Sequence, residues 1–495
     1  MGRSKQLQHW NNGIRGKPRQ LGHCFFPVIP SFHHSIIPLF HCATARVVLA
    51  LLVLGAPGAV RADFWDMASR FQVYVSAQEE YSDNIDLTAS NKLDDFITTV
   101  SPGLKFSSLP RTRVAAGEFR QTPGEGEENF GMNGDYHPGF VFYAKNTDRN
   151  YVSHDGTLNA WYTLDKRLTF RVREYLLRSE DPREPDYSQT AIPGQYILGT
   201  QRNRSTYLRN VFEPSLEYKF GKENLLSMSY QNNLYNTQNS SGRNSVENYF
   251  NPRLSYWFDI QNGVSLDYGL TLGHFEGSPD LVGHSVKGRY TYRFDPKTSL
   301  FGEYTFMLRN FDTPVEKLPV PIFPPPEPPS LDYTVHNPTV GIERVFSPTF
   351  SAKGQIGYYW QIPDQGSKKA GPFYNISLTK QAERTNLTLS LQGGYTEDFF
   401  SAQNLGFTKS YSAIGAVSHH LAEKMTVGLT GSFQRAISYD PDQKENIWDV
   451  SGNTSYQVLR WLSLFLSVSH REDHSSISTQ SYAENRGIFR MTATY

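Results

Sequence analysis

Apolar and polar residues alternate along most of the chain beyond residue 63. Apolar side chains occupy every second position in segments 71–77, 168–173, 285–294, 425–433 and 462–468. A period of two places successive side chains on opposite faces of a strand. Because no segment after residue 63 has a convincing helical period, the pattern predicts an all-β protein.

Short turns and longer polar segments divide this series into hairpins. We expect nine short turns, at 109–110, 165–166, 221–222, 261–262, 295–296, 347–348, 382–383, 422–423 and 459–460. Longer segments rich in Asn, Ser, Gly, Pro and Asp lie between them, at 122–149, 180–203, 236–244, 310–331 and 436–445. Nine hairpins with one further strand at each end give about 20 strands, within a range of roughly 16 to 24, and short turns opposite long loops are typical of transmembrane barrels.

A closed barrel accounts for this series better than a soluble sandwich or propeller. A soluble protein would have to bury one continuous apolar face in a very large core. In lipid every backbone polar group must be paired, and closure of the sheet achieves this. We therefore predict a closed antiparallel transmembrane β-barrel with short periplasmic turns, long outer loops and a lumen too wide for side chains alone to fill.

Two further patterns fit strands that cross a membrane. Segments 100–106, 212–218 and 250–256 share a proline at the third position, with looser copies at 336–340 and 372–376. This indicates hairpin duplication and predicts a bulge or local bend at each proline, although 29 prolines also allow a chance repeat. Aromatic residues precede several turns, as in a membrane-interface girdle or as ordinary strand propensity gives: Phe106, Tyr162, Phe220, Phe258, Phe294 and Phe346.

The first 62 residues differ from the rest of the chain. They hold seven basic residues and no acidic one, and an apolar run at 47–54 follows Arg46. Val60 and Ala62 supply small residues at the −3 and −1 sites, which predicts a signal peptide for Sec export cleaved after Ala62. The run is too short for the alternative, a membrane anchor. The long stretch 1–42 suggests an upstream mis-start, with translation beginning nearer Arg46.

Cleavage would leave a mature barrel of residues 63–495 and change its charge. The whole chain has 48 basic and 48 acidic residues, whereas 63–495 has 41 and 48, a net charge of −7. Both cysteines, Cys24 and Cys42, would be lost, so we expect no disulfide, thiolate metal site or c-type haem. This charge gives no support for binding nucleic acid.

The C-terminus resembles the signal by which outer-membrane proteins are recognised for insertion. Phe489, Met491, Ala493 and Tyr495 alternate on one face, and the last residue is aromatic. We therefore predict that Phe489, Met491 and Tyr495 form an insertion signal read by the barrel-assembly machinery.

Residues that could carry chemistry are sparse. His470 and His474 would lie about 13 Å apart on a strand, too far for one zinc ion. Asp440, Asp442 and Glu445 lack the spacing of an EF-hand. No nucleophile, phosphate-loop or dinucleotide motif has a supporting context. We predict neither catalysis nor a cofactor or metal site, the alternative being a hydrolase with a Ser/His pair on neighbouring strands.

The polar strand faces supply candidate residues for a lumen. The predicted pore-lining residues are Arg171, Arg173, Arg209, Glu213, Glu217, Lys219, Arg253, Lys287, Arg289 and Arg293. Basic side chains predominate, which favours anionic or hydroxylated solutes. The alternative is mixed charge that only keeps the lumen solvated.

Three short motifs near the start of the barrel resemble a known family. Segments 80–87 (EYSDNIDL), 94–97 (DDFI) and 101–104 (SPGL) are similar to those of a β-barrel porin family of Gram-negative outer membranes, most sharply over 70–110. Its members often resemble proteins encoded near exopolysaccharide and exosortase loci. The resemblance implies a channel in outer-membrane lipid for small polar or anionic solutes or for exopolysaccharide, with polysaccharide-export components as partners. The alternative is a scaffold or sheath for a periplasmic export machine or cytochrome.

Overall fold

The computed structural model describes residues 70–108, 129–183, 204–238, 244–312, 331–400, 406–439 and 442–495. All of them belong to one unit, Val60–Tyr495. Residues 1–62 lie outside the described residues, so the signal peptide and its cleavage after Ala62 stay predictions.

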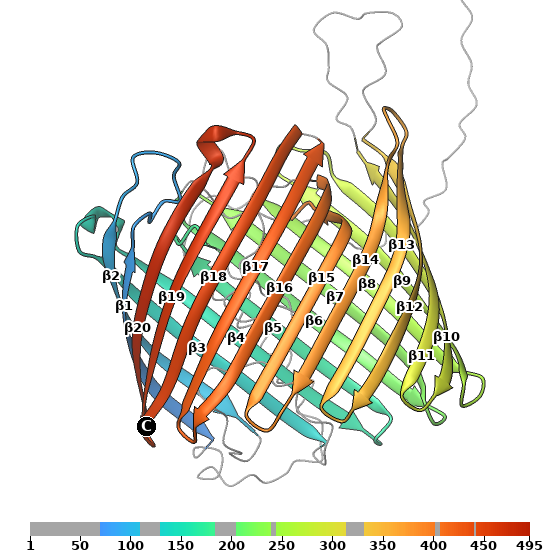
Figure 1. Ribbon diagram of the computed structural model, residues 1–495, viewed down its shortest axis with the longest axis horizontal. Coiled ribbons are helices and arrows are strands. Elements are labelled where there is room, and N and C mark those ends of the chain that lie inside the picture. The colour runs from blue at the N-terminus through green and yellow to red at the C-terminus, as the bar shows by residue number, and fades with distance from the viewer. Residues whose placement is uncertain are drawn as a thin grey trace, which may run out of the picture. The chain divides into compact units, whose positions relative to one another are not determined.

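The described residues form one antiparallel barrel of twenty strands (Figure 1). The strands are β1 (Phe71–Ser82), β2 (Asp95–Ser107), β3 (Phe130–Tyr143), β4 (Tyr151–Leu164), β5 (Leu168–Ser179), β6 (Tyr207–Phe220), β7 (Asn224–Thr237), β8 (Ser245–Trp257), β9 (Asn262–Phe275), β10 (Leu281–Asp295), β11 (Thr298–Phe311), β12 (Tyr333–Ser347), β13 (Phe350–Pro363), β14 (Lys369–Gln381), β15 (Thr385–Asp398), β16 (Gly406–Ala422), β17 (Met425–Tyr439), β18 (Asp442–Leu459), β19 (Leu462–Ser475) and β20 (Tyr482–Thr494). Each strand pairs with its neighbours in the chain, and β1 pairs with β20, which closes the wall. The predicted fold class and strand number are confirmed. Within the described ranges, no helix is long and apolar enough to span a membrane.

Eight of the nine predicted short turns join consecutive strands in connections of two to four residues. The ninth, at 109–110, falls outside the described residues, and the strands it was to join are separated by residues 108–129. Two predicted loops are wrong, because β3 lies within 122–149 and because β17 and β18 leave only residues 440–441 of 436–445 between them. In β3, Gly131, Gly134 and Pro138 suggest a loop, but neighbouring strands pair with this segment on both sides.

The outer wall of the barrel is apolar and exposed. Val75, Leu104, Leu266, Leu429 and Val468 are 44–61% exposed, which in a membrane means contact with lipid rather than water. Exposed aromatic residues gather at the short-turn end, among them the predicted Tyr162, Phe258, Phe294 and Phe346. Their position matches a girdle at the inner membrane interface.

The prolines of the repeat interrupt the sheet without shifting its register. Of the predicted bulge or local bend, the bulge is therefore wrong, and the bend stays a prediction. Next to Pro214, Phe212 pairs with Asn232 and Ser215 with Ser229, which is the same register on both sides of the gap. Pro252 and Pro338 lie in similar gaps. On the other side of each proline the pairing is continuous. A strand residue directs its N–H toward one neighbour only, so a proline removes pairing on one side.

The motif at 80–87 forms the outer end of the closing seam. The seam has nine residue pairs between β1 and β20, whereas β1 and β2 share twelve. Ser82 Oγ donates to Glu484 (2.7 Å), and the buried Asn84 donates to the Ala483 carbonyl (3.0 Å). The family-like residues therefore hold the first and last strands together.

The barrel lumen as candidate functional site

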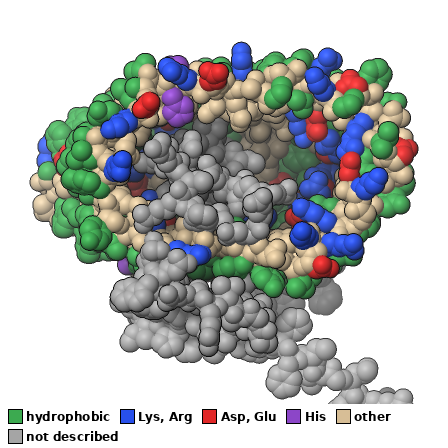
Figure 2. Space-filling model, turned by 90° about the horizontal axis from the view of Figure 1, so that it is seen from below, with side chains coloured by type: hydrophobic (Ala, Val, Ile, Leu, Met, Phe, Trp, Pro, Cys, Tyr) green, Lys and Arg blue, Asp and Glu red, His purple; other side chains and the backbone are tan. Residues whose placement is uncertain are grey.

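All ten predicted pore-lining residues lie on the inner strand faces. They belong to β5, β6, β8 and β10 and alternate with outward residues such as Leu216, Leu254 and Tyr290, which are 39–49% exposed. Figure 2 shows Lys, Arg, Asp and Glu side chains along the inner wall and hydrophobic side chains around the outside. This places the residues at the lumen, while their role in conduction stays a prediction.

Carboxylates on neighbouring strands offset much of the positive charge. The Asp267 carboxylate lies 3.0 Å from Arg253 Nε and 3.3 Å from Lys287 Nζ. Glu343 lies 2.7 Å from Arg289 Nη2 and 3.1 Å from Lys353 Nζ.

Most of the other predicted charged residues also lie close to a side chain of opposite charge. Arg293 pairs with Glu223 (2.5 Å), Arg173 with Glu213 (3.4 Å), and Lys219 approaches Glu217 (3.8 Å). The basic majority of the predicted set therefore overstates the net charge of the wall, since Asp267, Glu343 and Glu223 are absent from that set. The alternation along the sequence shows on which face of a strand a side chain lies. It does not show with which side chain of a neighbouring strand that residue pairs.

Arg171 and Arg209 differ from the rest. Within the described part of the chain, the buried Nε of Arg171 has no hydrogen-bond partner. Arg209 is only 1% exposed and donates to Asn233 Oδ1 (3.0 Å) and the Phe400 carbonyl (2.9 Å). Arg171 forms no ion pair with a described residue, whereas Arg209 is part of the packed structure.

The opposite wall carries uncharged polar side chains. Because Leu387, Leu429, Val450 and Leu466 point outward, the alternate residues of β15, β17, β18 and β19 face the lumen. They include Thr388, Ser390, Gln392, Thr430, Ser432, Gln434, Ser451, Asn453, Ser455, Ser463 and Ser467. The lumen thus has one wall rich in paired charges and one rich in hydroxyl and amide groups, which also carries Asp449, Arg471 and Asp473 toward the outer end.

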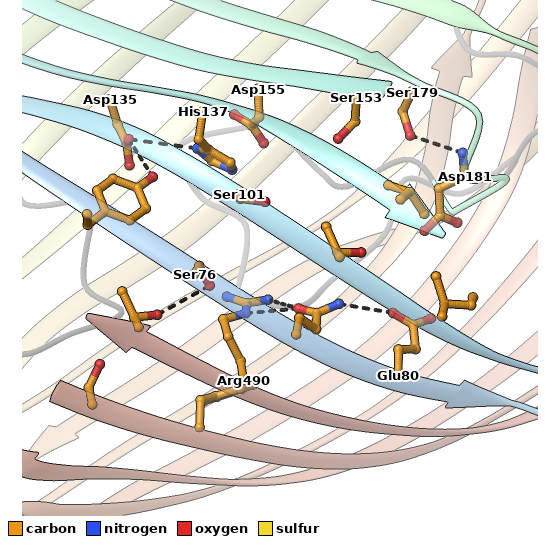
Figure 3. A pocket seen from close by; sticks show the side chains of 18 of the residues that line it. Ser76, Glu80, Ser101, Asp135, His137, Ser153, Asp155, Ser179, Asp181 and Arg490 are labelled. Atoms are coloured by element: carbon orange, nitrogen blue, oxygen red, sulfur yellow. Dashed lines mark hydrogen bonds and ion pairs between the residues drawn. The ribbon is translucent and has the colours of Figure 1, made fainter. Parts of the chain in front are cut away.

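A cavity of about 840 Å³ lies in the lumen beside the closing seam (Figure 3). Asp135 and His137 from β3 lie near Asp155 from β4, and Arg490 of β20 lies across from them. Tyr74 Oη donates to Asp135 (2.8 Å). Asp135 and His137 are absent from the predicted pore-lining set because the sequence predicts a loop at 122–149, where the structure has β3.

A buried ionic network that lines part of this cavity ties Arg183, just after β5, to the seam. Glu80 on β1 accepts from Arg486 of β20 (2.7 Å) and lies 3.0 Å from Arg183, which follows β5. Arg183 also donates to Glu484 (2.8 Å). The side chains of Arg183, Glu80 and Glu484 are 3–5% exposed. Arg183, just after β5, therefore contacts both strands of the closing seam.

The predicted insertion-signal residues lie on the outer face of β20 or directly after it. Phe489 and Met491 are 42% and 44% exposed, and the Tyr495 side chain is fully exposed. These side chains contribute little packing to the barrel itself. Their role as a signal stays a prediction.

The histidine and acidic clusters form ordinary polar contacts where they are described. His474 pairs with Glu472 (3.0 Å), and Gln443 donates to Glu445 (2.6 Å), whereas Asp440 lies outside the described residues. No group of three potential metal ligands occurs among the residues that the structure describes.

Comparisons with known proteins agree with the architecture. Residues 278–495, which contain β10 to β20, match the family described as "Putative beta-barrel porin 2". This match confirms the resemblance to β-barrel porins, although it does not include 70–110, where we expected it to be sharpest. No curated protein matches the chain.

Similar solved structures include three barrels at 8–11% identity. The FrpB iron transporter from Neisseria meningitidis has a TM-score of 0.48, with 86% of this chain and 81% of that one covered. The copper transporter OprC has 0.45 (86% and 80%), and the outer membrane protein opdK from Pseudomonas aeruginosa 0.39 (86% and 100%). By its closed wall, its apolar outer face and the family match, the chain is a porin-like outer-membrane β-barrel whose residues 278–495 match a porin family.

Proposed function

We propose that the protein is a non-enzymatic channel that passes small polar or anionic solutes across the outer membrane. The observation that carries this proposal is a closed wall of twenty strands, apolar outside and polar inside. A barrel of this size encloses more space than its inward side chains fill. Water in that space replaces the hydrocarbon barrier, and solutes then cross by diffusion.

The wall charges give the proposed channel a modest anion preference. Most lumenal cations are paired with carboxylates and so contribute little net potential. Arg171 and Arg490 are different, since neither forms an ion pair with a described residue, and Arg490 donates to the neutral Gln78 (2.7 Å). Unpaired guanidinium groups at a water-filled wall attract anions over about one Debye length.

Within the same proposal, an exopolysaccharide chain is the larger cargo that the family resemblance implies. The hydroxyl and amide side chains of β15, β17, β18 and β19 support this cargo. These groups are uncharged and can exchange hydrogen bonds with sugar hydroxyls. Polysaccharide-export components would then be periplasmic partners. Export by the Sec pathway and insertion by the barrel-assembly machinery belong to the same proposal.

Single-channel recording in a planar bilayer tests the proposal. Protein purified from outer membranes should give stable steps with more anion than cation current. A folded, heat-modifiable barrel that stays silent over many insertions would contradict the channel. Silence together with a stoichiometric co-purifying periplasmic protein would favour the alternative scaffold or sheath.

A further inference from the structure

The barrel wall divides between β14 and β15 toward its outer end. Pairing between these strands ends at Tyr374 and Gly393, so residues 369–373 of β14 have no partner on β15. The β15–β16 pairing nevertheless continues to Asp398 and Gly406. Gly394, at the point of separation, has a φ of +150°, which L side chains rarely adopt. Beyond Gly393, β15 thus separates from β14, while β16 stays paired with β17 as far as Thr408. Residues 394–400 and 406–407 are here called the crossing hairpin.

The crossing hairpin packs against the inner face of the wall. The Tyr395 ring lies 5.0 Å from that of Tyr359 on β13, and the Phe407 ring lies 5.7 Å from that of Tyr333 on β12. Tyr359 and Tyr333 are 0% and 4% exposed. These aromatic residues form a buried cluster on the inner side of the wall, which indicates a fixed position for the hairpin.

An ion pair also holds the crossing hairpin against the same side of the wall. Glu397 accepts from Arg309 Nη2 of β11 (2.6 Å) and from Tyr333 Oη (2.7 Å). The Arg309 side chain is 8% exposed. Charge-assisted hydrogen bonds of this geometry are stronger than neutral ones, particularly when they are shielded from water.

The tip of the hairpin contacts the far wall. Arg209 of β6 donates to the Phe400 carbonyl (2.9 Å), and the Phe400 ring stacks on Phe275 of β9 at 5.1 Å. Around a ring of twenty strands, β9 and β6 lie six and nine positions from β15. In Figure 1, β6 passes behind β15 and β16 on the opposite wall.

We infer that the crossing hairpin is the selectivity constriction of the channel: a bar across the outer mouth, anchored on both walls, that sets the largest solute admitted. This inference rests on the proposed function. The anchors show why the bar stays in place, since aromatic packing and the Glu397 pair hold one end while Arg209 and Phe275 hold the other. Phe400 and Glu397 are therefore specificity-determining positions of the pore.

Release of the bar tests the inference. The variant Glu397→Ala with Phe400→Ala removes one anchor from each end, and Thr396→Ala, at the exposed position directly before Glu397, is the matched control. All proteins are purified from outer membranes and checked for heat-modifiable migration. We expect the released variant to conduct about twofold or more above wild type and to admit larger neutral sugars in liposome swelling. The control should match wild type.

A cross-link that keeps the crossing hairpin in place is a second test. It does not depend on correct folding of the released variant. The mature chain has no cysteine, so Phe275→Cys with Phe400→Cys can be bridged by a short bifunctional thiol reagent. The bridged protein should keep wild-type conductance and size limit, and the single Phe400→Ala variant should show part of the increase.

The outcomes separate this inference from the proposed function. If wild type and the released variant conduct equally and admit the same sugars, the constriction is refuted and the channel stands. A silent wild type with a conducting released variant supports the bar as the barrier and refutes an open resting channel. If every folded variant is silent, both are refuted.

Discussion

The substitution Glu80→Ala should weaken the seam that closes the barrel. The Glu80 carboxylate is 4% exposed and accepts from Arg486 Nε and Nη2, both at 2.7 Å, while Arg183 lies 3.0 Å away. Its removal leaves two guanidinium groups buried with less counter-charge. Loss of one partner from a buried ion pair costs about 3–5 kcal/mol.

The neighbouring Glu79→Ala is the matched control. Glu79 has the same charge on the same strand but is exposed on the outer face, where it accepts from Thr98 (2.7 Å). Near the outer end of β1, an outward charge changes stability by about 1 kcal/mol or less.

Urea unfolding in lipid vesicles, followed by tryptophan fluorescence, measures both variants against wild type. A large loss for Glu80→Ala with little change for Glu79→Ala is expected. Equal and small losses would refute the reasoning, because the buried network would then contribute nothing to closure.

Three further substitutions test separate parts of the account. Gly103→Ala should cost about 1–3 kcal/mol in the same unfolding assay, because a Cβ there would lie 2.2 Å from the Tyr74 ring and would disturb its bond to Asp135; unchanged stability would contradict this packing. Tyr495→Ala should lower the amount of protein in the outer membrane without changing the stability of the refolded barrel, since the side chain is fully exposed; equal amounts by quantitative immunoblotting would contradict a signal role. Arg171→Glu should lower the anion-to-cation permeability ratio measured from reversal potentials, and an unchanged ratio would show that this group does not bias permeation.

Much of the architecture could be predicted because its signals are local. The alternation of side chains and the turn residues at positions such as 165–166 and 295–296 depend on neighbours in the sequence. They were sufficient for the fold class, the strand number and eight turns.

The sequence predictions are wrong where contacts between residues far apart in the chain determine the structure. In β3 a run containing glycine and proline resembles a loop, but Gly131 provides room for the Trp161 ring, to which an added Cβ would be 1.8 Å away. In the same way, pairing of Asp267 with both Arg253 and Lys287 requires the register of three strands. The crossing hairpin could not be predicted either, since the alternation in β15 continues past Gly394 while the strand leaves the wall.

The most direct test of the central claim is the single-channel conductance and ion selectivity of the protein purified from outer membranes. Stable steps with a modest excess of anion current are expected, because water would fill the lumen and because Arg171 and Arg490 form no ion pair with a described residue. Consistent silence from a barrel that is folded and inserted would contradict a channel and would favour a sheath or scaffold in its place.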